Sequence, residues 1–383
     1  MSTATAEAPE ALGDATRHQP RARATLAAAL AAGPGHAYLF RGPRGSGKRT
    51  AARAFAAELL ALGAPDPDDA RRRTMIDPSP HPDLVWMRPP GAQHLVEEIR
   101  ESVIRAASLS PAEGERRVFV IEEAEALRDE SQNALLKTLE EPAPFAHLIL
   151  IASDPELLAG TILSRCAPVE FTSLPPDAVL DALGDSHDSD ATRADASAAS
   201  RLSGGDVELA RLLLTERGAA LRTSAERAAR AAIAGGEGEP WREFLAVAEE
   251  AGAEAGAEEE QRLLAEAEET GRRGRAGKKL TREAGEQVKR VERRARTRAL
   301  DLALSLCAAW FRDLAAVAAG AGDVVLNSDR VDALREDAAG VGPADARFAL
   351  EWVLDTRRRL RLNVSEELAL EALWLRLQST LSA

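Results

Sequence analysis

The residues whose types and spacing most clearly suggest chemistry lie between Gly42 and Thr50, in the order Gly-Pro-Arg-Gly-Ser-Gly-Lys-Arg-Thr. Up to the lysine they match the phosphate-binding pattern G-x-x-x-x-G-K. Glycines let backbone N–H groups converge on phosphate oxygens, and a lysine in this place reaches the β- and γ-phosphates of a nucleotide. The pattern predicts a nucleotide-binding loop, with a glycine-rich turn that binds no ligand as the alternative. The predicted binding residues are Gly42, Gly45, Ser46, Gly47, Lys48, Arg49 and Thr50.

One position departs from this pattern, which places a Ser or Thr hydroxyl after the lysine to hold Mg²⁺. Arg49 stands there, and Thr50 follows one residue later. Successive helix residues point about 100° apart, so Thr50 does not simply replace the missing hydroxyl. The substitution argues against Mg²⁺ binding and against hydrolysis, although ATP or ADP is still expected to bind.

Two carboxylates, Glu122 and Glu123, follow a predicted strand. A nucleotide site of this type uses one strand-end carboxylate to hold Mg²⁺ and a second to orient the attacking water. The usual first residue is Asp, and Glu122 is longer by one methylene. Alternatively, both residues favour the start of the next helix through its dipole. Ser153, after a further strand, is in a position where a polar residue can contact phosphate.

Arg165 lies in the stretch Thr161 to Cys166. An arginine there can point out of its domain and stabilise transition-state charge on the phosphate of a neighbouring chain. Taken alone, an arginine of this kind more often forms a surface salt bridge. We expect Cys166 to be a packed thiol rather than a nucleophile, because no histidine partner is evident.

Alternating apolar segments predict the elements that position these residues. Short, uninterrupted apolar runs are typical of parallel strands that are buried on both faces. Strands that alternate with helices predict a parallel α/β sheet with ligands at the strand C-termini. The predicted strands are Ala37–Phe40, Arg117–Ile121, Leu148–Ala152 and Val169–Phe171, and the predicted helices are Arg21–Ala32, Thr50–Leu60, Leu95–Ala107 and Ser131–Glu141.

After Pro176 the strand signals largely stop, and the remaining sequence is predicted to be helical. An acidic segment, 249–269, precedes a basic segment, 272–298, that contains twelve Lys and Arg residues. Adjacent runs of opposite charge are typical of solvated helix faces, and a DNA-facing surface is the alternative. Apolar periodicity predicts further helices over Leu302–Ala318, Phe348–Leu362 and Ser365–Leu381.

Length and composition set wider bounds. A chain of 383 residues is long enough for two or three domains, and a net charge of −13 argues against a whole-protein electrostatic grip on nucleic acid. Two cysteines suggest a reducing compartment and exclude a four-cysteine zinc site. No apolar run approaches the ~20 residues of a membrane span, and no signal segment is evident. We therefore expect a cytoplasmic protein with a disordered leader over residues 1–16.

Several motifs together identify a family. The N-terminal motifs are His36–Lys48, His81–Leu84, Val118–Glu125, Asn133–Pro142 and Ser164–Cys166. They resemble the clamp-loader subunits of bacterial DNA polymerase III, which belong to the AAA+ class, and most closely those of the delta-prime type. Further segments are similar to the family's C-terminal domain, namely Trp310–Leu314, Leu326–Asp329 and Leu362–Glu371.

The resemblance implies a RecA-like AAA+ P-loop domain over 17–174, a small helical lid over 175–228 and a helical collar domain over 229–383. It implies a subunit of a partly open, five-membered ring that contains gamma/tau and delta subunits. Such a ring uses ATP to load the sliding clamp onto primer–template DNA. In that setting Arg165 would be an arginine finger given in trans to an adjacent gamma/tau ATPase.

Departures from the family's ATPase pattern favour a regulatory subunit with little or no ATPase activity. Arg49, Glu122 and Glu208, the last in place of a sensor arginine, alter three parts of the hydrolytic machinery, whereas Arg165 is intact. An active gamma/tau-type ATPase is the alternative, and an unrelated AAA+ remodelling module is a third. Polymerase activity is assigned to another chain, because no polymerase carboxylate constellation is evident.

The zinc module of many relatives is also missing. The connection over residues 63–90 is rich in Pro, Asp and Arg and contains no cysteine. We therefore expect no zinc, and a connection that is either held by packing or mobile. Its last part, Leu84 to Trp86, has the composition of a strand.

Overall fold

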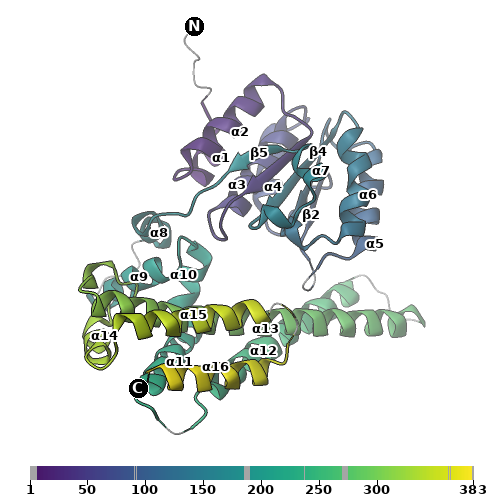
Figure 1. Cartoon of the computed structure of the whole chain (residues 1–383). Coiled ribbons are helices and arrows are strands. Elements are labelled where there is room, and N and C mark those ends of the chain that lie inside the picture. Colours follow the sequence, from purple (N-terminus) through teal and green to yellow (C-terminus); the bar gives the residue numbers. More distant parts are fainter. Residues whose placement is uncertain are drawn as a thin grey trace. The chain divides into compact units, whose positions relative to one another are not determined.

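The computed structural model describes the chain except residues 1–6, 90, 92, 185–189, 237, 270–274, 361, 363 and 382–383. It divides into two compact units, Met1–Pro175 and Pro176–Ala383 (Figure 1). The first unit combines a sheet with helices, and the second is helical. The predicted fold class, an α/β domain followed by all-α structure, is confirmed.

A five-stranded parallel sheet forms the centre of the first unit, with the strand order β2-β3-β4-β1-β5. The central strand β4 is buried along its whole length. Its neighbours β1 and β3 are nearly as buried, which agrees with their uninterrupted apolar sequences. The strands are β1 (Ala37–Arg41), β2 (Leu84–Met87), β3 (Arg117–Ile121), β4 (Ala146–Ala152) and β5 (Ala167–Glu170).

Helices cover both faces of this sheet (Figure 1). Because successive strand residues point to opposite faces, β1 contributes to two separate cores. Phe40 packs in one core with Phe55, and Leu39 packs in the other with Leu135. The helices are α1 (Glu10–Ala15), α2 (Pro20–Ala32), α3 (Lys48–Ala61), α4 (Pro67–Met75), α5 (Val96–Ile99), α6 (Asp129–Glu140) and α7 (Gly160–Leu163).

The predicted helix Leu95–Ala107 is present but not uniformly wound. After α5 the chain forms a π-helix, η1 (Arg100–Arg105), and then a 3-10 turn, η2 (Ala106–Ser108). Ile99, Val103 and Ala107 are buried. The predicted apolar face is therefore correct, although the helix type changes along it.

The disordered leader predicted through residue 16 does not hold for residues 10–15, which form α1. Leu12 is fully buried and packs in the core that contains Phe55. The side chain of Thr16, also buried, donates a hydrogen bond to the carbonyl of Leu12. A partner from another helix orders this segment, and local composition does not reveal such a partner. Residues 1–6 of the predicted leader lie outside the described residues.

The second unit is helical throughout the residues that the structure describes. A hydrophobic cluster that includes Leu221, Trp310 and Leu377 joins helices from its beginning, middle and end. Its helices are α8 (Pro176–Leu183), α9 (Asp190–Leu202), α10 (Val207–Leu213), α11 (Glu216–Ile233), α12 (Arg242–Glu269), α13 (Arg275–Ala318), η5 (Gly322–Val324), α14 (Val331–Ala338), α15 (Pro343–Leu360) and α16 (Glu366–Leu381).

Helix α11 runs across the predicted boundary at residue 228. Its buried residues Leu221 and Ala229, on either side of that boundary, belong to the same cluster. Buried contacts therefore cross the predicted boundary between the lid and the collar, and both lie in one compact unit. The division found after Pro175 lies one residue from the predicted end of the α/β domain.

The acidic and basic segments form two long helices, α12 and α13, that lie side by side (Figure 1). Arg296 of α13 lies 3.7 Å from Glu249 of α12, and Gln287 donates a hydrogen bond to Glu259. The predicted adjacency of an acidic and a basic helix is confirmed. Residues 272–274 of the basic segment lie outside the described residues, and a DNA-facing role for the segment stays a hypothesis.

Candidate functional site

The glycine-rich loop joins the end of β1 to the start of α3, as predicted. Gly42 has φ 146°, and a Cβ there would lie 2.1 Å from the carbonyl oxygen of Phe171. Gly47, which caps the N-terminus of α3, has φ 85°. Both positions require glycine, because other residues are strained in this region of φ. The loop therefore lies at the N-terminus of a 14-residue helix, whose dipole favours anions.

Lys48 lies against the loop and is only 5% exposed. Its Nζ donates hydrogen bonds to the carbonyls of Gly42 and Pro43, at 2.6 Å and 2.5 Å. Ser46 is buried, and its carbonyl accepts a hydrogen bond from Gln19. These contacts hold the ammonium group beside the loop backbone, where the sequence predicts a phosphate.

Arg49 points toward carboxylates of the same unit. Its Nη2 lies 2.6 Å from Oδ2 of Asp77, and its Nε lies 3.1 Å from Oε1 of Glu122. Thr50 is exposed. The residue in the position of the Mg²⁺ hydroxyl is thus an arginine in contact with the first acidic residue of the predicted metal motif.

The strand register brings the acidic motif to the edge of the sheet that carries the loop. Ile121 pairs with Leu150, and Ala152 pairs with Arg41, so Glu122, Glu123 and Ser153 all follow strand ends at this edge. Glu123 has φ 50°, in the left-handed region.

The helix-capping alternative for the two glutamates is not supported by the geometry that follows β3. The next element is only a three-residue 3-10 turn, η3 (Ala124–Ala126), and Glu123 makes no side-chain capping bond to it. Oε1 of Glu122 instead accepts hydrogen bonds from Trp86 and Arg88, in addition to its contact with Arg49.

Three residues of this site were not predicted from the sequence, namely Asp77, Arg53 and Arg88. Asp77 contacts Arg53 at 2.9 Å and Arg88 at 2.7 Å, besides Arg49. Burial alone would raise the pKa of Asp77, but the hydrogen bond from Arg88 and the charges of the three arginines lower it. The Asp and Arg content of the connection over 63–90 was the available signal for Asp77 and Arg88, although it does not specify these pairs, and Arg53 lies outside it in α3.

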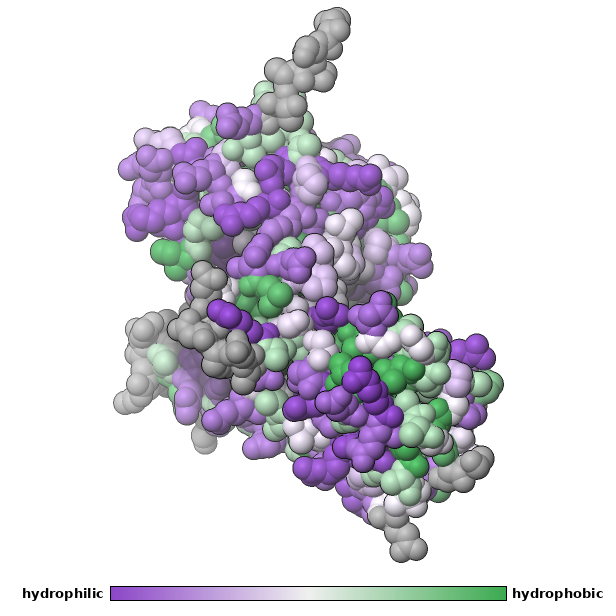
Figure 2. Space-filling model, turned by 90° about the vertical axis from the view of Figure 1, so that its left-hand side faces the viewer, coloured by the Kyte–Doolittle hydropathy of each residue, from purple (hydrophilic) through white to green (hydrophobic). Residues whose placement is uncertain are grey.

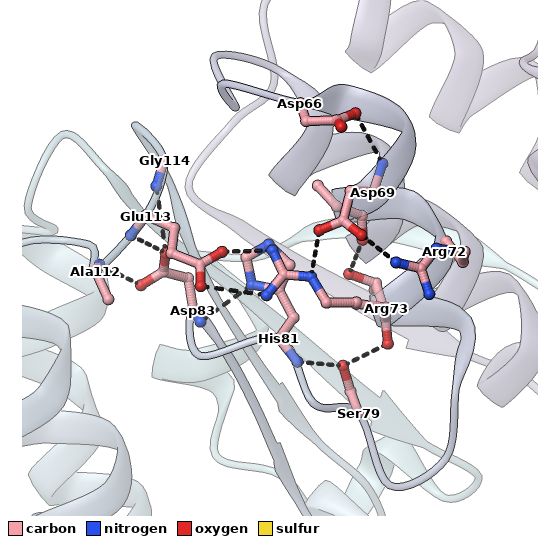
Figure 3. Close-up of polar contacts among 12 residues, drawn as sticks. Asp66, Asp69, Arg72, Arg73, Ser79, His81, Asp83, Ala112, Glu113 and Gly114 are labelled. Atoms are coloured by element: carbon pink, nitrogen blue, oxygen red, sulfur yellow. Dashed lines mark hydrogen bonds and ion pairs between the residues drawn. The ribbon is translucent and has the colours of Figure 1, made fainter.

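The same connection is held by polar contacts rather than by packing alone (Figure 3). Asp83 is fully buried and accepts hydrogen bonds from the backbone N–H groups of Ala112 and Glu113, at 2.6 Å and 3.0 Å. Arg73 of α4 forms ion pairs with Asp69 and Glu113. The connection is therefore ordered through carboxylate and arginine contacts to the loop before β3.

Arg165 lies at the opposite edge of the sheet from the glycine-rich loop. Ala167 pairs with Tyr38, which places Arg165 where the strands begin, six residues before Gly42 in the register. At the usual rise per strand residue this is roughly 20 Å from the loop. Arg165 is exposed, and its guanidinium contacts Glu140 and the carbonyl of Thr161.

Cys166 is buried, and burial raises the pKa of its thiol to about 12. The thiol is therefore protonated at neutral pH, in agreement with a packing role.

Glu208, predicted in place of a sensor arginine, belongs to α10 of the second unit. Among the described residues there is no cluster of three His, Cys, Asp or Glu that could hold a metal ion. No described helix has the length and hydrophobicity that crossing a membrane requires.

Comparison with known proteins finds similarity in the first unit. The family model described as "DNA polymerase III, delta subunit" matches residues 18–175. DNA polymerase III subunit delta' of Bacillus subtilis is 34% identical over 150 residues, which cover 39% of this chain and 45% of that protein. DNA polymerase III subunit tau/gamma of Haemophilus influenzae is 36% identical over 142 residues, which cover 36% of this chain and 20% of that protein.

A crystal structure of a DNA polymerase III gamma subunit-related protein from Thermotoga maritima aligns with a TM-score of 0.43 and 13% identity, covering 94% of this chain and 99% of that one. The chain spans less than half the length of the two curated relatives. The match to the family model lies in the unit that contains the glycine-rich loop, the acidic motif and Arg165. Residues 18–175 of this chain are therefore similar to subunits of bacterial DNA polymerase III.

Proposed function

We propose that this chain is a delta-prime-type subunit of a DNA polymerase III clamp loader. It acts with gamma/tau and delta subunits in the ATP-driven loading of a sliding clamp onto primer–template DNA. Its specific contribution is Arg165, which it donates in trans to the ATP site of an adjacent gamma/tau subunit. The observation that carries this proposal is that Arg165 is exposed at the edge of the sheet opposite the chain's own phosphate loop.

The chemistry of an arginine finger suits this position. A guanidinium group is always charged, and its planar N–H groups match the oxygens of a phosphoryl group in transfer. In the isolated chain Arg165 pairs with Glu140, and both side chains are partly exposed. Exposed pairs contribute only about 0–1 kcal/mol, so a neighbour's phosphate can replace Glu140 at little cost.

The chain's own nucleotide site is proposed to bind ATP or ADP with little or no hydrolysis. Hydrolysis in this class needs a metal ion on the strand-end carboxylate and a positioned water. The contacts of Glu122 with Arg49, Arg88 and Trp86 oppose metal binding at that carboxylate. Lys48 and the glycine geometry of the loop support phosphate binding.

The helical unit is proposed to hold the chain in the complex. Apolar surface gathers on this unit (Figure 2). On α16, Leu368 and Leu375 are 66% and 60% exposed, whereas Leu370, Leu373 and Leu377 are buried. The helix therefore has an outward apolar stripe besides its core face, and such a stripe is typical of a surface that packs against another subunit.

An active gamma/tau-type ATPase is the second candidate. The tau/gamma relative, Lys48 and Glu123 favour it, whereas Arg49 and its contact with Glu122 oppose it. ATP turnover by the purified chain, compared with complexes assembled with and without it, separates the two functions. A delta-prime-type subunit stays near background alone and is required for activity of the complex. An active ATPase turns over alone, and its turnover is lost in Lys48→Ala.

A further inference from the structure

Three arginines and two carboxylates meet beside the phosphate loop. We call them the arginine cluster, and its members are Arg49, Arg53, Arg88, Asp77 and Glu122. Arg49 contacts both carboxylates, whereas Arg53 contacts only Asp77 of the two. The cluster carries one more positive than negative charge at the edge of the sheet that holds the loop.

The residues at this edge do not fit a Mg²⁺ ion. Mg²⁺ requires near-octahedral oxygen ligands at about 2.0–2.1 Å, and the loop pattern supplies one of them as a hydroxyl after the lysine. Arg49 offers no oxygen at that position. Oε1 of Glu122 is contacted by Arg49 at 3.1 Å and by Arg88 at 2.9 Å, and it accepts a hydrogen bond from Trp86. A divalent cation at this carboxylate would face two guanidinium groups of like charge.

We propose that the Arg49 guanidinium takes the place of Mg²⁺, so that the loop binds a nucleoside di- or triphosphate without a divalent cation. This inference rests on the proposed binding of nucleotide by the loop. Arg49 follows Lys48 in the first turn of α3, at the end of the helix that faces the loop. Its planar N–H groups suit two phosphate oxygens at once.

The cluster allows Arg49 to exchange partners. Asp77 contacts Arg53 and Arg88 as well as Arg49, so its charge remains compensated when Arg49 turns to a phosphate. Lys48 and Arg49 then place two fixed positive charges beside the phosphates. These positive charges neutralise the phosphate charge, as Mg²⁺ does in related sites. The ligand class is therefore the metal-free nucleotide rather than its magnesium complex.

Equilibrium binding of fluorescent ADP to the full chain tests this proposal, with measurements in EDTA and in millimolar Mg²⁺. We expect the two dissociation constants to agree within about twofold. In Arg49→Ser, affinity in EDTA should fall roughly tenfold or more, because a charge-assisted contact is lost. Mg²⁺ should restore part of the affinity of that variant, since the hydroxyl of the loop pattern is then present.

The matched control is Arg72→Ala, which removes an exposed arginine that pairs with Asp69 outside the cluster. It should bind ADP as the unchanged chain does. The proposal is overturned if the unchanged chain needs Mg²⁺ to bind ADP, if it binds ADP in neither buffer, or if Arg49→Ser keeps full affinity in EDTA. None of these outcomes bears on the proposed role of Arg165, which is tested separately by ATP hydrolysis in the assembled complex.

Discussion

Lys48 and Arg49 are neighbours in the chain but have different partners. Lys48 donates to carbonyls of its own loop, whereas Arg49 reaches carboxylates from two other segments. The first arrangement follows from the local loop pattern. The second depends on Asp77, which lies 28 residues further along the chain. The contacts of Lys48 are therefore determined by the local loop, whereas the contacts of Arg49 depend on the tertiary fold.

Gly42 gives a prediction at this scale. In Gly42→Ala the new Cβ would lie 2.1 Å from the carbonyl oxygen of Phe171, and the alanine would have to adopt a φ of 146°. We expect the α/β unit to lose about 1–3 kcal/mol of unfolding free energy, with weaker ADP binding. Urea unfolding and ADP titration measure both effects. Gly160→Ala, where nothing lies within 4 Å, is the control and should leave both nearly unchanged.

His147 predicts a pH dependence of stability. Burial lowers the pKa of this histidine in β4 to about 4. Because the folded state then binds fewer protons than the unfolded chain, the contribution to stability is present above about pH 6.5 and is lost as the pH falls toward 4. Between pH 7 and pH 5 the unchanged chain should lose about 2 kcal/mol more than His147→Gln.

Amide hydrogen exchange of β4 at several pH values measures this difference within the α/β unit. The hydrogen-bonding partner of His147, the carbonyl of Gly35, remains available to the glutamine amide. Parallel pH profiles for the two proteins would show that His147 does not titrate across the unfolding equilibrium in this range.

At the scale of elements, the connection over 63–90 shows how a segment without a metal module is ordered. Buried Asp83 accepts backbone N–H groups from the loop before β3, and Arg71 of α4 forms a hydrogen-bonded pair with buried Glu58 of α3. These contacts attach α4 to α3 and the start of β2 to the loop before β3. They also position Asp77 and Arg88 beside the phosphate loop.

Removal of the Asp83 carboxylate tests this account of the connection. In Asp83→Ala the N–H groups of Ala112 and Glu113 lose their buried acceptor. We expect a loss of about 3 kcal/mol of unfolding free energy, with faster amide exchange in β2 and β3. Asp68→Ala, which removes a carboxylate that is 95% exposed, should change the unfolding free energy by less than about 0.5 kcal/mol. Equal effects of the two changes would contradict the account.

The elements differ in how far their sequence predicts them. Local sequence predicts the strands β1, β3 and β4 from their apolar runs, and it predicts the loop from its glycine spacing. These predictions are confirmed. Helix α1 was not predicted, because its order depends on burial of Leu12 against another helix. The contact of Arg49 with Glu122 could not be predicted either, since it joins residues 73 positions apart through the strand register.

At the scale of the whole molecule, two units carry different proposed tasks. The α/β unit holds the proposed nucleotide site and Arg165 at opposite edges of one sheet. The helical unit exposes apolar side chains on α16 that its own core does not use. Each task can therefore be removed by changes that leave the other unit folded.

The double change Leu368→Glu and Leu375→Glu should abolish or strongly weaken assembly with gamma/tau and delta subunits. The side chains are exposed, so the helical unit should keep its circular dichroism and melting behaviour. Gel filtration of mixed subunits measures assembly. Leu264→Glu on α12 changes a leucine that is 61% exposed, and it should assemble normally. Full assembly of the double variant would remove this stripe from the interface.

The central claim is tested most directly by ATP hydrolysis in reconstituted clamp-loader complexes that contain the unchanged chain, Arg165→Ala or Arg105→Ala. Arg105 is an exposed arginine that pairs with Glu101 one turn away, and its removal should leave turnover unchanged. All three complexes should assemble, because Arg165 contributes little to folding. We expect Arg165→Ala to slow hydrolysis by about 10³-fold or more. Hydrolysis at the unchanged rate in a fully assembled Arg165→Ala complex would contradict the proposed role of this chain as an arginine donor.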